Sequence, residues 1–186
     1  RMIQLFEDIT SRAGELLRYD SSAPLIFNSG LFLFLFVAFF GIYLLLRRTT
    51  TLRILYVIAF SLFFYYKSSG IYFLLLVFAS VSDYLISHSI ARTKDKRIKR
   101  RWVAASVVIN LGMLGYFKYT NFFIEIANSI AGAGFLDFQN IFLPVGISFY
   151  TFQALSYVID VYRGDAPAQK NLAAFGVYVT LFPQLI

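Results

Sequence analysis

The residues between Leu143 and Arg163 combine an apolar background with polar groups that could take part in chemistry. Hydroxyls, phenols, an amide, a carboxylate and a guanidinium recur there at helical spacings, which places many of them on related faces of one helix. A polar side chain in hydrocarbon is costly unless a partner satisfies it. We therefore expect this segment to line a protein-enclosed, partly hydrated cavity. The expected lining residues are Ser148, Tyr150, Thr151, Gln153, Tyr157, Asp160 and Arg163.

Two further features of this segment bear on how it is built. Pro144 and Gly146 favour a broken or kinked start to the helix, and such a break is tolerated at membrane depth where protein or water covers the backbone. Asp160 and Arg163 are three residues apart, so we expect them to neutralise one another across a turn, with Tyr157 above Asp160. The alternative interpretation is that these polar groups only hold neighbouring helices together.

Other polar residues give weaker indications of chemistry. His88 is the only histidine, and a lone histidine near the end of an apolar run is more typical of an interfacial residue than of a catalytic base. Asp83 lies inside the same run, where we expect it to pair with a hydroxyl or a cation on a neighbouring helix. The sequence shows no metal-ligand cluster, no phosphate-binding glycine loop and no Ser/His/Asp set.

A second polar set shares one face of a later helix, which we expect either to point into the interior or to form a solvated helix end. Its members are Lys118, Asn121, Phe122 and Glu125.

The composition of the chain is that of a membrane protein. Of its 186 residues, 59% are hydrophobic and 15% are charged, against about half and about a quarter in soluble domains. The absence of cysteine excludes disulfides, thiolate metal sites and a cysteine nucleophile from this sequence. The net charge of +7 does not indicate nucleic-acid binding, because the basic residues gather in loops between apolar segments.

The apolar pattern divides the chain into two regions. Residues 1–24 predict an amphipathic helix on the membrane surface and a turn, with a soluble helix packed on a neighbour as the alternative. Residues 25–186 predict an all-α, polytopic membrane helix bundle with about six apolar helices. Residues 122–131 either continue the fourth helix or follow a break at Thr120-Asn121. The expected helices are 25–46, 52–66, 71–87, 102–119, 140–162 and 171–186.

The basic loops predict the orientation of these helices. Arg47, Arg48 and Arg53 follow the first span, seven basic residues lie between 92 and 101 after the third, and only Lys67 lies between the second and third. Basic loops stay in the cytoplasm, so we expect the N-terminus outside and the 92–101 loop beside anionic lipid headgroups.

Several motifs in this chain occur together. The run Leu143-Pro-Val-Gly-Ile-Ser-Phe-Tyr-Thr-Phe-Gln153 is followed by Ser156-Tyr157 and by Asp160-Val-Tyr-Arg-Gly164. Three other stretches are Phe27-Asn-Ser29, Phe117-Lys-Tyr-Thr-Asn-Phe-Phe123 and Phe182-Pro-Gln-Leu185. In this combination the chain resembles the membrane-bound O-acyltransferase family. The resemblance is to the branch that includes the membrane subunits for alginate O-acetylation and for D-alanine transfer to teichoic acids.

This resemblance implies a helical bundle around a tunnel through the bacterial cytoplasmic membrane, with the catalytic centre at membrane depth. It implies transfer of an acyl group, with acetyl expected, from acetyl-CoA or an acyl-carrier thioester to an exported or cell-surface polysaccharide, with no bound cofactor or metal. The implied partners are membrane lipids and a periplasmic or surface-anchored transferase.

The family's essential histidine lies in a Trp- and Arg-rich motif beyond the Phe182–Leu185 stretch, and His88 does not occupy that motif. We therefore expect this chain to be the N-terminal part of such an enzyme, with no catalytic residue of its own and no activity alone. Two alternatives belong to other classes: a transporter or lipid-binding module, and a scaffold that docks a partner. Transporters tend to repeat a broken helix, and no internal repeat is visible here.

Overall fold

The computed structural model describes residues 30–131 and 136–181, and all regular structure in these ranges is helical. The predicted all-α class is therefore confirmed for this part of the chain. The surface helix expected in residues 1–24, the Phe27–Ser29 motif and the Phe182–Leu185 motif lie outside the described residues. The helices are α2 (Gly30–Leu45), α3 (Thr50–Ser69), α4 (Phe73–Arg92), α5 (Lys96–Leu114), α6 (Thr120–Ala131), α7 (Ile147–Arg163) and α8 (Leu172–Thr180).

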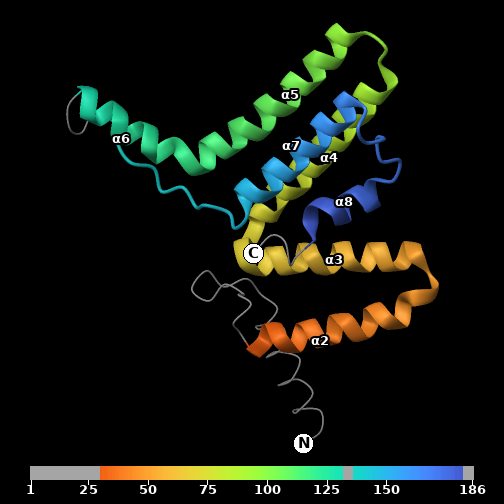
Figure 1. The fold of residues 1–186 in the computed structure, drawn as a ribbon. Helices are drawn as coiled ribbons and strands as arrows, with labels where there is room; N and C mark the ends of the chain where they lie inside the picture. Colours follow the sequence, from red (N-terminus) through yellow and green to blue (C-terminus); the bar gives the residue numbers. More distant parts are fainter. Residues whose placement is uncertain (1–29, 132–135, 182–186) are drawn as a thin grey trace, which may run out of the picture.

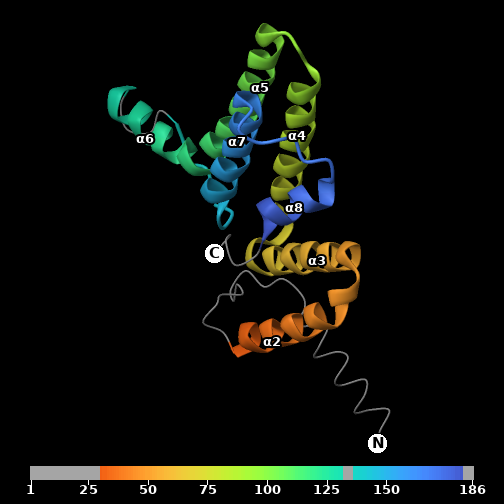
Figure 2. The same ribbon diagram turned by 45° about the vertical axis from the view of Figure 1, so that its right-hand side comes forward.

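Three long helices form the centre of the molecule. Helices α4 and α7 lie side by side, and α5 packs against both of them (Figure 1). Helices α2 and α3 form an antiparallel pair set across the lower end of that group, and α8 lies between α3 and α4 (Figure 2). The largest cluster of buried apolar side chains joins five of these helices. It comprises Tyr65, Leu76, Ala79, Leu114, Ile147, Tyr150, Ala154, Phe175 and Val179.

The chain changes direction sharply between α3 and α4. Gly70 adopts φ 60°, a conformation that a side chain would strain, and its N–H binds the carbonyl oxygen of Tyr66. The two 20-residue helices on either side correspond to the predicted spans 52–66 and 71–87. Each is about 30 Å long, which matches the hydrocarbon thickness of a bilayer.

Among the described helices, one stretch is long and apolar enough to cross a membrane: Thr50–Arg92, 43 residues that include this turn. The segment Phe32–Leu45 is apolar but shorter. The expectation of about six spans therefore stays a prediction.

Helices α5 and α6 are one continuous helical run with a π-helical segment, Gly115–Tyr119, between them. The run bends there (Figure 1), as expected where the regular hydrogen-bond ladder is interrupted. Of the two sequence alternatives, continuation past Thr120-Asn121 is thus the correct one. At the other end, Asp95 caps α5, because its carboxylate accepts a hydrogen bond of 2.8 Å from the Arg97 N–H.

The helix expected over residues 140–162 begins later than predicted. Residues 136–146 are not helical, and α7 starts only at Ile147. Pro144 lacks the N–H that a helix interior requires, and Gly146 has φ 71°, in the left-handed region. The broken start that these two residues predicted is therefore confirmed, and it displaces the helix boundary.

Candidate functional site

The irregular backbone before α7 is held by the last turns of α3. The hydroxyl of Tyr65 donates to the Val145 carbonyl oxygen at 2.7 Å, and the Val145 N–H donates to the Ser69 hydroxyl at 3.1 Å. Both clamping side chains are fully buried. A buried break before a helix requires such partners, since its backbone groups have no regular hydrogen-bond ladder. Sequence reasoning found the break but missed Tyr65 and Ser69, which lie about 80 residues earlier in the chain.

Two asparagines of α6 fix the segment that leads to this break. The Asn121 side chain donates to the Gln139 carbonyl and accepts from the Gln139 N–H, both at 2.9 Å. Asn128 makes the same pair of bonds with Leu136, at 2.9 Å and 2.8 Å. The spacing of seven residues puts both amides on one face of α6. Each amide pairs with a backbone N–H and a C=O of the returning segment, as the backbone of a neighbouring strand does in a sheet.

The other members of the set expected on this face point elsewhere. Lys118, Phe122 and Glu125 are exposed, which agrees with the solvated alternative for the helix end. The Lys118 ammonium nevertheless reaches the hydroxyl of Ser148 at 3.3 Å. The π-helical segment thereby places a cation beside the first turn of α7.

The inner face of α7 contributes to the core. Tyr150 and Thr151 are fully buried there. The Tyr150 ring packs edge-to-face on Tyr65, with centroids 6.2 Å apart. The Thr151 hydroxyl has no hydrogen-bond partner among the described residues. The structure therefore places these two expected lining residues among the packed helices.

The outer face of α7 borders an open groove of about 600 Å³. Two of the predicted residues, Ser148 and Gln153, meet there, and the Gln153 amide donates to the Tyr178 carbonyl of α8 at 2.7 Å. The groove offers hydroxyl and amide groups among aromatic side chains, a combination suited to a ligand that is partly polar. It is lined by Ser148, Phe149, Phe152, Gln153, Ser156 and Tyr178.

The remaining predicted residues lie nearer the end of α7. The Tyr157 hydroxyl accepts from the Gln169 N–H at 2.6 Å, and its ring lies 4.7 Å from that of Phe175. The expected ion pair between Asp160 and Arg163 is not formed in the described part of the chain. Arg163 is exposed at the last residue of the helix, where pairing with a neighbouring carboxylate stabilises little.

By contrast, the backbone carbonyl oxygen of Asp160 takes part in the C-terminal cap of α7. It accepts from the N–H groups of Gly164, Asp165 and Ala166 at 3.0, 2.9 and 3.4 Å. Gly164 has φ 87°, which allows the chain to turn back there.

Asp83 is fully buried between α4 and α5, in a polar clamp made with Ser106 and Asn110. Its carboxylate accepts from the Ser106 hydroxyl at 2.6 Å and from the Asn110 amide at 3.0 and 2.8 Å. The predicted pairing with a hydroxyl on a neighbouring helix is thus confirmed. The four-residue spacing of Ser106 and Asn110 on one face of an apolar helix was the signal that would have revealed the partners.

His88 lies on α4 with its ring 4.7 Å from that of Tyr84. It is not among the residues that line the groove beside α7. In the described ranges no group of three or more His, Cys, Asp or Glu side chains could hold a metal ion.

Comparison with known proteins gives several similar sequences. A probable alginate O-acetylase of Pseudomonas aeruginosa is 40% identical over 169 residues, which are 87% of this chain and 32% of that protein. The chain is similar to bacterial O-acetylases over most of its own length. A probable alginate O-acetylase of Azotobacter vinelandii is 37% identical, with 87% of this chain and 33% of that protein covered. A peptidoglycan O-acetyltransferase of Helicobacter pylori is 30% identical, with 87% and 36% covered.

These O-acetylase relatives confirm the resemblance predicted from the motifs. The chain spans about a third of the length of the curated relatives it matches. No family model matches the chain, and no solved structure matches it.

Proposed function

We propose that the whole protein is a membrane O-acyltransferase that moves an acetyl group from a cytoplasmic thioester to an exported or cell-surface polysaccharide. The observation that carries this proposal is the 40% identity, over 87% of the chain, to a probable alginate O-acetylase. Acetyl-CoA or an acyl carrier is the proposed donor. A periplasmic or surface-anchored transferase is the proposed partner that completes the reaction.

The proposed location is the bacterial cytoplasmic membrane, crossed several times. In support, α3 and α4 have the length of a bilayer span, and large apolar side chains are widely exposed. Phe34, Val108 and Ile130 are 72%, 70% and 82% exposed, respectively. The predicted basic loop 92–101 is helical except at residues 93–95, because Arg92 ends α4 and α5 begins at Lys96. We propose that these basic residues face the cytoplasm and that the N-terminus lies outside.

The proposed chemistry defines what the complete site must supply. A base takes the proton of the acceptor hydroxyl while the hydroxyl oxygen attacks the thioester carbonyl carbon. Hydrogen-bond donors stabilise the oxyanion that forms. The carbon–sulfur bond then breaks, and the thiolate leaves and takes up a proton. We place no catalytic base in this chain, because His88 packs on Tyr84 and does not border the groove.

The role that we assign to this chain is to bind and orient a substrate beside α7. Ser148, Gln153 and Ser156 present polar groups in the groove, and Lys118 adds a positive charge next to Ser148. Tyr157, Asp160 and Arg163, farther along α7, are proposed to extend this lining. The clamp on Val145 keeps the first turn of α7 in place and therefore fixes where Ser148 points.

Acetyl transfer in membrane vesicles tests this proposal. Vesicles containing the whole protein receive radiolabelled acetyl-CoA and alginate or peptidoglycan, and the label in the polymer is measured. We expect transfer by the wild type and reduced transfer by Gln153→Leu and Asp160→Ala at unchanged protein levels. Ser129→Ala, an exposed position on α6, is the matched control. Absence of transfer to any polymer from acetyl-CoA or an acyl-carrier thioester, with the partner transferase present, would refute the proposal.

A further inference from the structure

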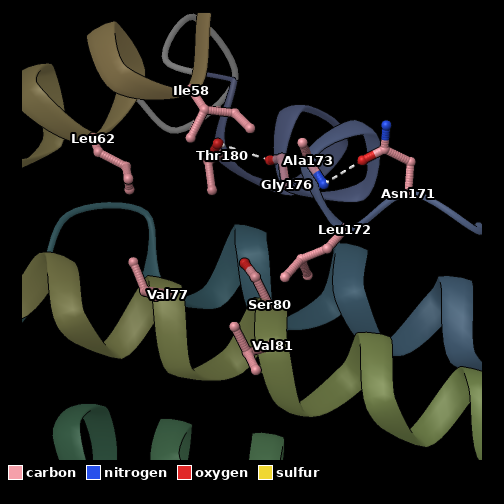
Figure 3. Close-up of a pocket in the computed structure, with 10 residues that line it drawn as sticks. All are labelled: Ile58, Leu62, Val77, Ser80, Val81, Asn171, Leu172, Ala173, Gly176 and Thr180. Atoms are coloured by element: carbon pink, nitrogen blue, oxygen red, sulfur yellow. Dashed lines mark hydrogen bonds between the residues drawn. The ribbon is translucent and has the colours of Figure 1, made fainter. Parts of the chain in front are cut away.

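A second cavity lies between α3, α4 and α8, away from the groove beside α7. Its volume is about 440 Å³, within the range of roughly 300–1,000 Å³ that small-molecule ligands occupy. Figure 3 shows side chains from all three helices around it. The lining residues are Ile58, Leu62, Val77, Ser80, Val81, Asn171, Leu172, Ala173, Gly176 and Thr180.

The two hydroxyls at this cavity and the side-chain oxygen of Asn171 are already used within the protein. The Ser80 hydroxyl donates to the Leu76 carbonyl at 2.8 Å, and the Thr180 hydroxyl donates to the Gly176 carbonyl at 2.7 Å. The Asn171 side-chain oxygen accepts from the Ala173 N–H at 2.9 Å (Figure 3). A ligand therefore finds no free hydroxyl donor here, and the remaining wall is aliphatic. Such a wall favours a hydrocarbon occupant over a sugar or a nucleotide.

Positive charge lies at the Asn171 end of the cavity. Lys170 is exposed immediately before Asn171, and its carbonyl accepts from the Tyr84 hydroxyl at 2.9 Å, which fixes its backbone beside α4. Helix α8 begins at Leu172, directly after Asn171, and contributes the positive end of its dipole. An aliphatic cavity with a cation at one end matches an anionic phospholipid, whose phosphate carries the negative charge and whose chains are apolar.

We propose that this cavity binds one acyl chain of an anionic phospholipid of the cytoplasmic leaflet, with the phosphate beside Lys170. Tyr84, which binds the Lys170 carbonyl, lies in the half of α4 that ends at Arg92, and both basic residues would face the anionic leaflet. The bound lipid would fill the space between α8 and the α3–α4 corner. This inference rests on the membrane placement proposed above.

Photo-crosslinking in a bilayer tests the proposal. The whole protein is reconstituted with phosphatidylglycerol that carries a diazirine in one acyl chain, and the cross-linked residues are mapped by mass spectrometry. We expect cross-links at cavity residues such as Leu62, Val77 and Ala173. Val81→Phe, which enlarges a cavity side chain, should remove them, and Lys170→Glu should weaken them.

Leu85→Phe is the matched control, because Leu85 lies on the same helix but is 58% exposed outside the cavity. It should leave the cavity cross-links unchanged. Ala173→Leu serves as a second blocking variant if Val81→Phe disturbs folding. Cross-links at exposed Phe78 and Leu85 without any in the cavity would overturn this inference and leave the membrane placement intact. Absence of cross-links at all of these residues would overturn both.

Discussion

The hydroxyl of Tyr65 donates a hydrogen bond of 2.7 Å to the Val145 carbonyl oxygen, although 80 residues separate them in the chain. Both groups lie where α3 ends and where α7 is about to begin. The Ser69 hydroxyl accepts from the Val145 N–H, so one residue before α7 has both its backbone donor and its backbone acceptor satisfied by the same helix.

Tyr65→Phe tests the importance of this bond. The substitution keeps the ring in the core but leaves a backbone carbonyl without its partner, so we expect a loss of about 1–3 kcal/mol in the free energy of unfolding. Denaturant unfolding in detergent micelles measures it. Tyr116→Phe removes a hydroxyl from a 59% exposed ring and should change stability little. Equal effects of the two substitutions would contradict the assignment.

Gly146→Ala tests the left-handed backbone at the same place. A Cβ at φ 71° is strained, and we expect a destabilisation of about 1–2 kcal/mol. Gly112→Ala should change the stability in the opposite direction, because Gly112 lies within α5 and nothing lies within 4 Å of the added Cβ. Alanine there should stabilise by about 0.5–1 kcal/mol. Thermal unfolding of both variants provides the comparison, and a shared sign would refute the explanation.

Asp83→Ala tests the buried clamp between α4 and α5. Removing the carboxylate leaves the Ser106 hydroxyl without its acceptor, at a cost of about 1–3 kcal/mol. The Asn110 amide loses its bonds to Asp83 and keeps only those to Ser106. Asp83→Asn retains an acceptor oxygen and should cost less. Chemical unfolding of the two variants, with exposed Asp165→Ala as the control, measures the difference. If the clamp stabilised the fold only through the charge of Asp83, the Asn and Ala substitutions would lower the free energy of unfolding equally.

Asn121→Ala and Asn128→Ala test how α6 holds the segment before α7. Each removes two hydrogen bonds to the backbone of residues 136–139, and each bond is worth about 0.5–1.5 kcal/mol net. We expect faster protease cleavage within 136–139 in both variants, measured by mass spectrometry of the fragments. Ser129→Ala on the same helix should cleave at the wild-type rate. Unchanged cleavage in the double variant would show that other contacts hold the segment.

The sequence predicted the elements that depend on local signals. The apolar runs located α3 and α4, and the Pro144-Val-Gly146 stretch located the broken start of α7. Continuity through Gly115–Tyr119 could not be decided from the pattern, because the π-helical segment keeps the chain helical while shifting the faces of the residues after it.

The candidate site was predicted less well, because its geometry depends on distant residues. Ser148 and Gln153 border the groove, but Tyr150 and Thr151, which carry equally suitable hydroxyls, face the packed helices. Spacing alone assigns residues to faces without saying which face the other helices cover. The partners of Val145 and of residues 136–139 come from α3 and α6, and no local pattern connects them.

The hydrogen bond between Ser69 and Val145 has a mechanical consequence. Ser69 directly precedes Gly70, where α3 turns into α4, and Val145 directly precedes Gly146, where the chain turns into α7. The two turns are therefore joined directly by one hydrogen bond. A tilt of α3 against α4 would be transmitted to the first turn of α7, and with it to the mouth of the groove at Ser148.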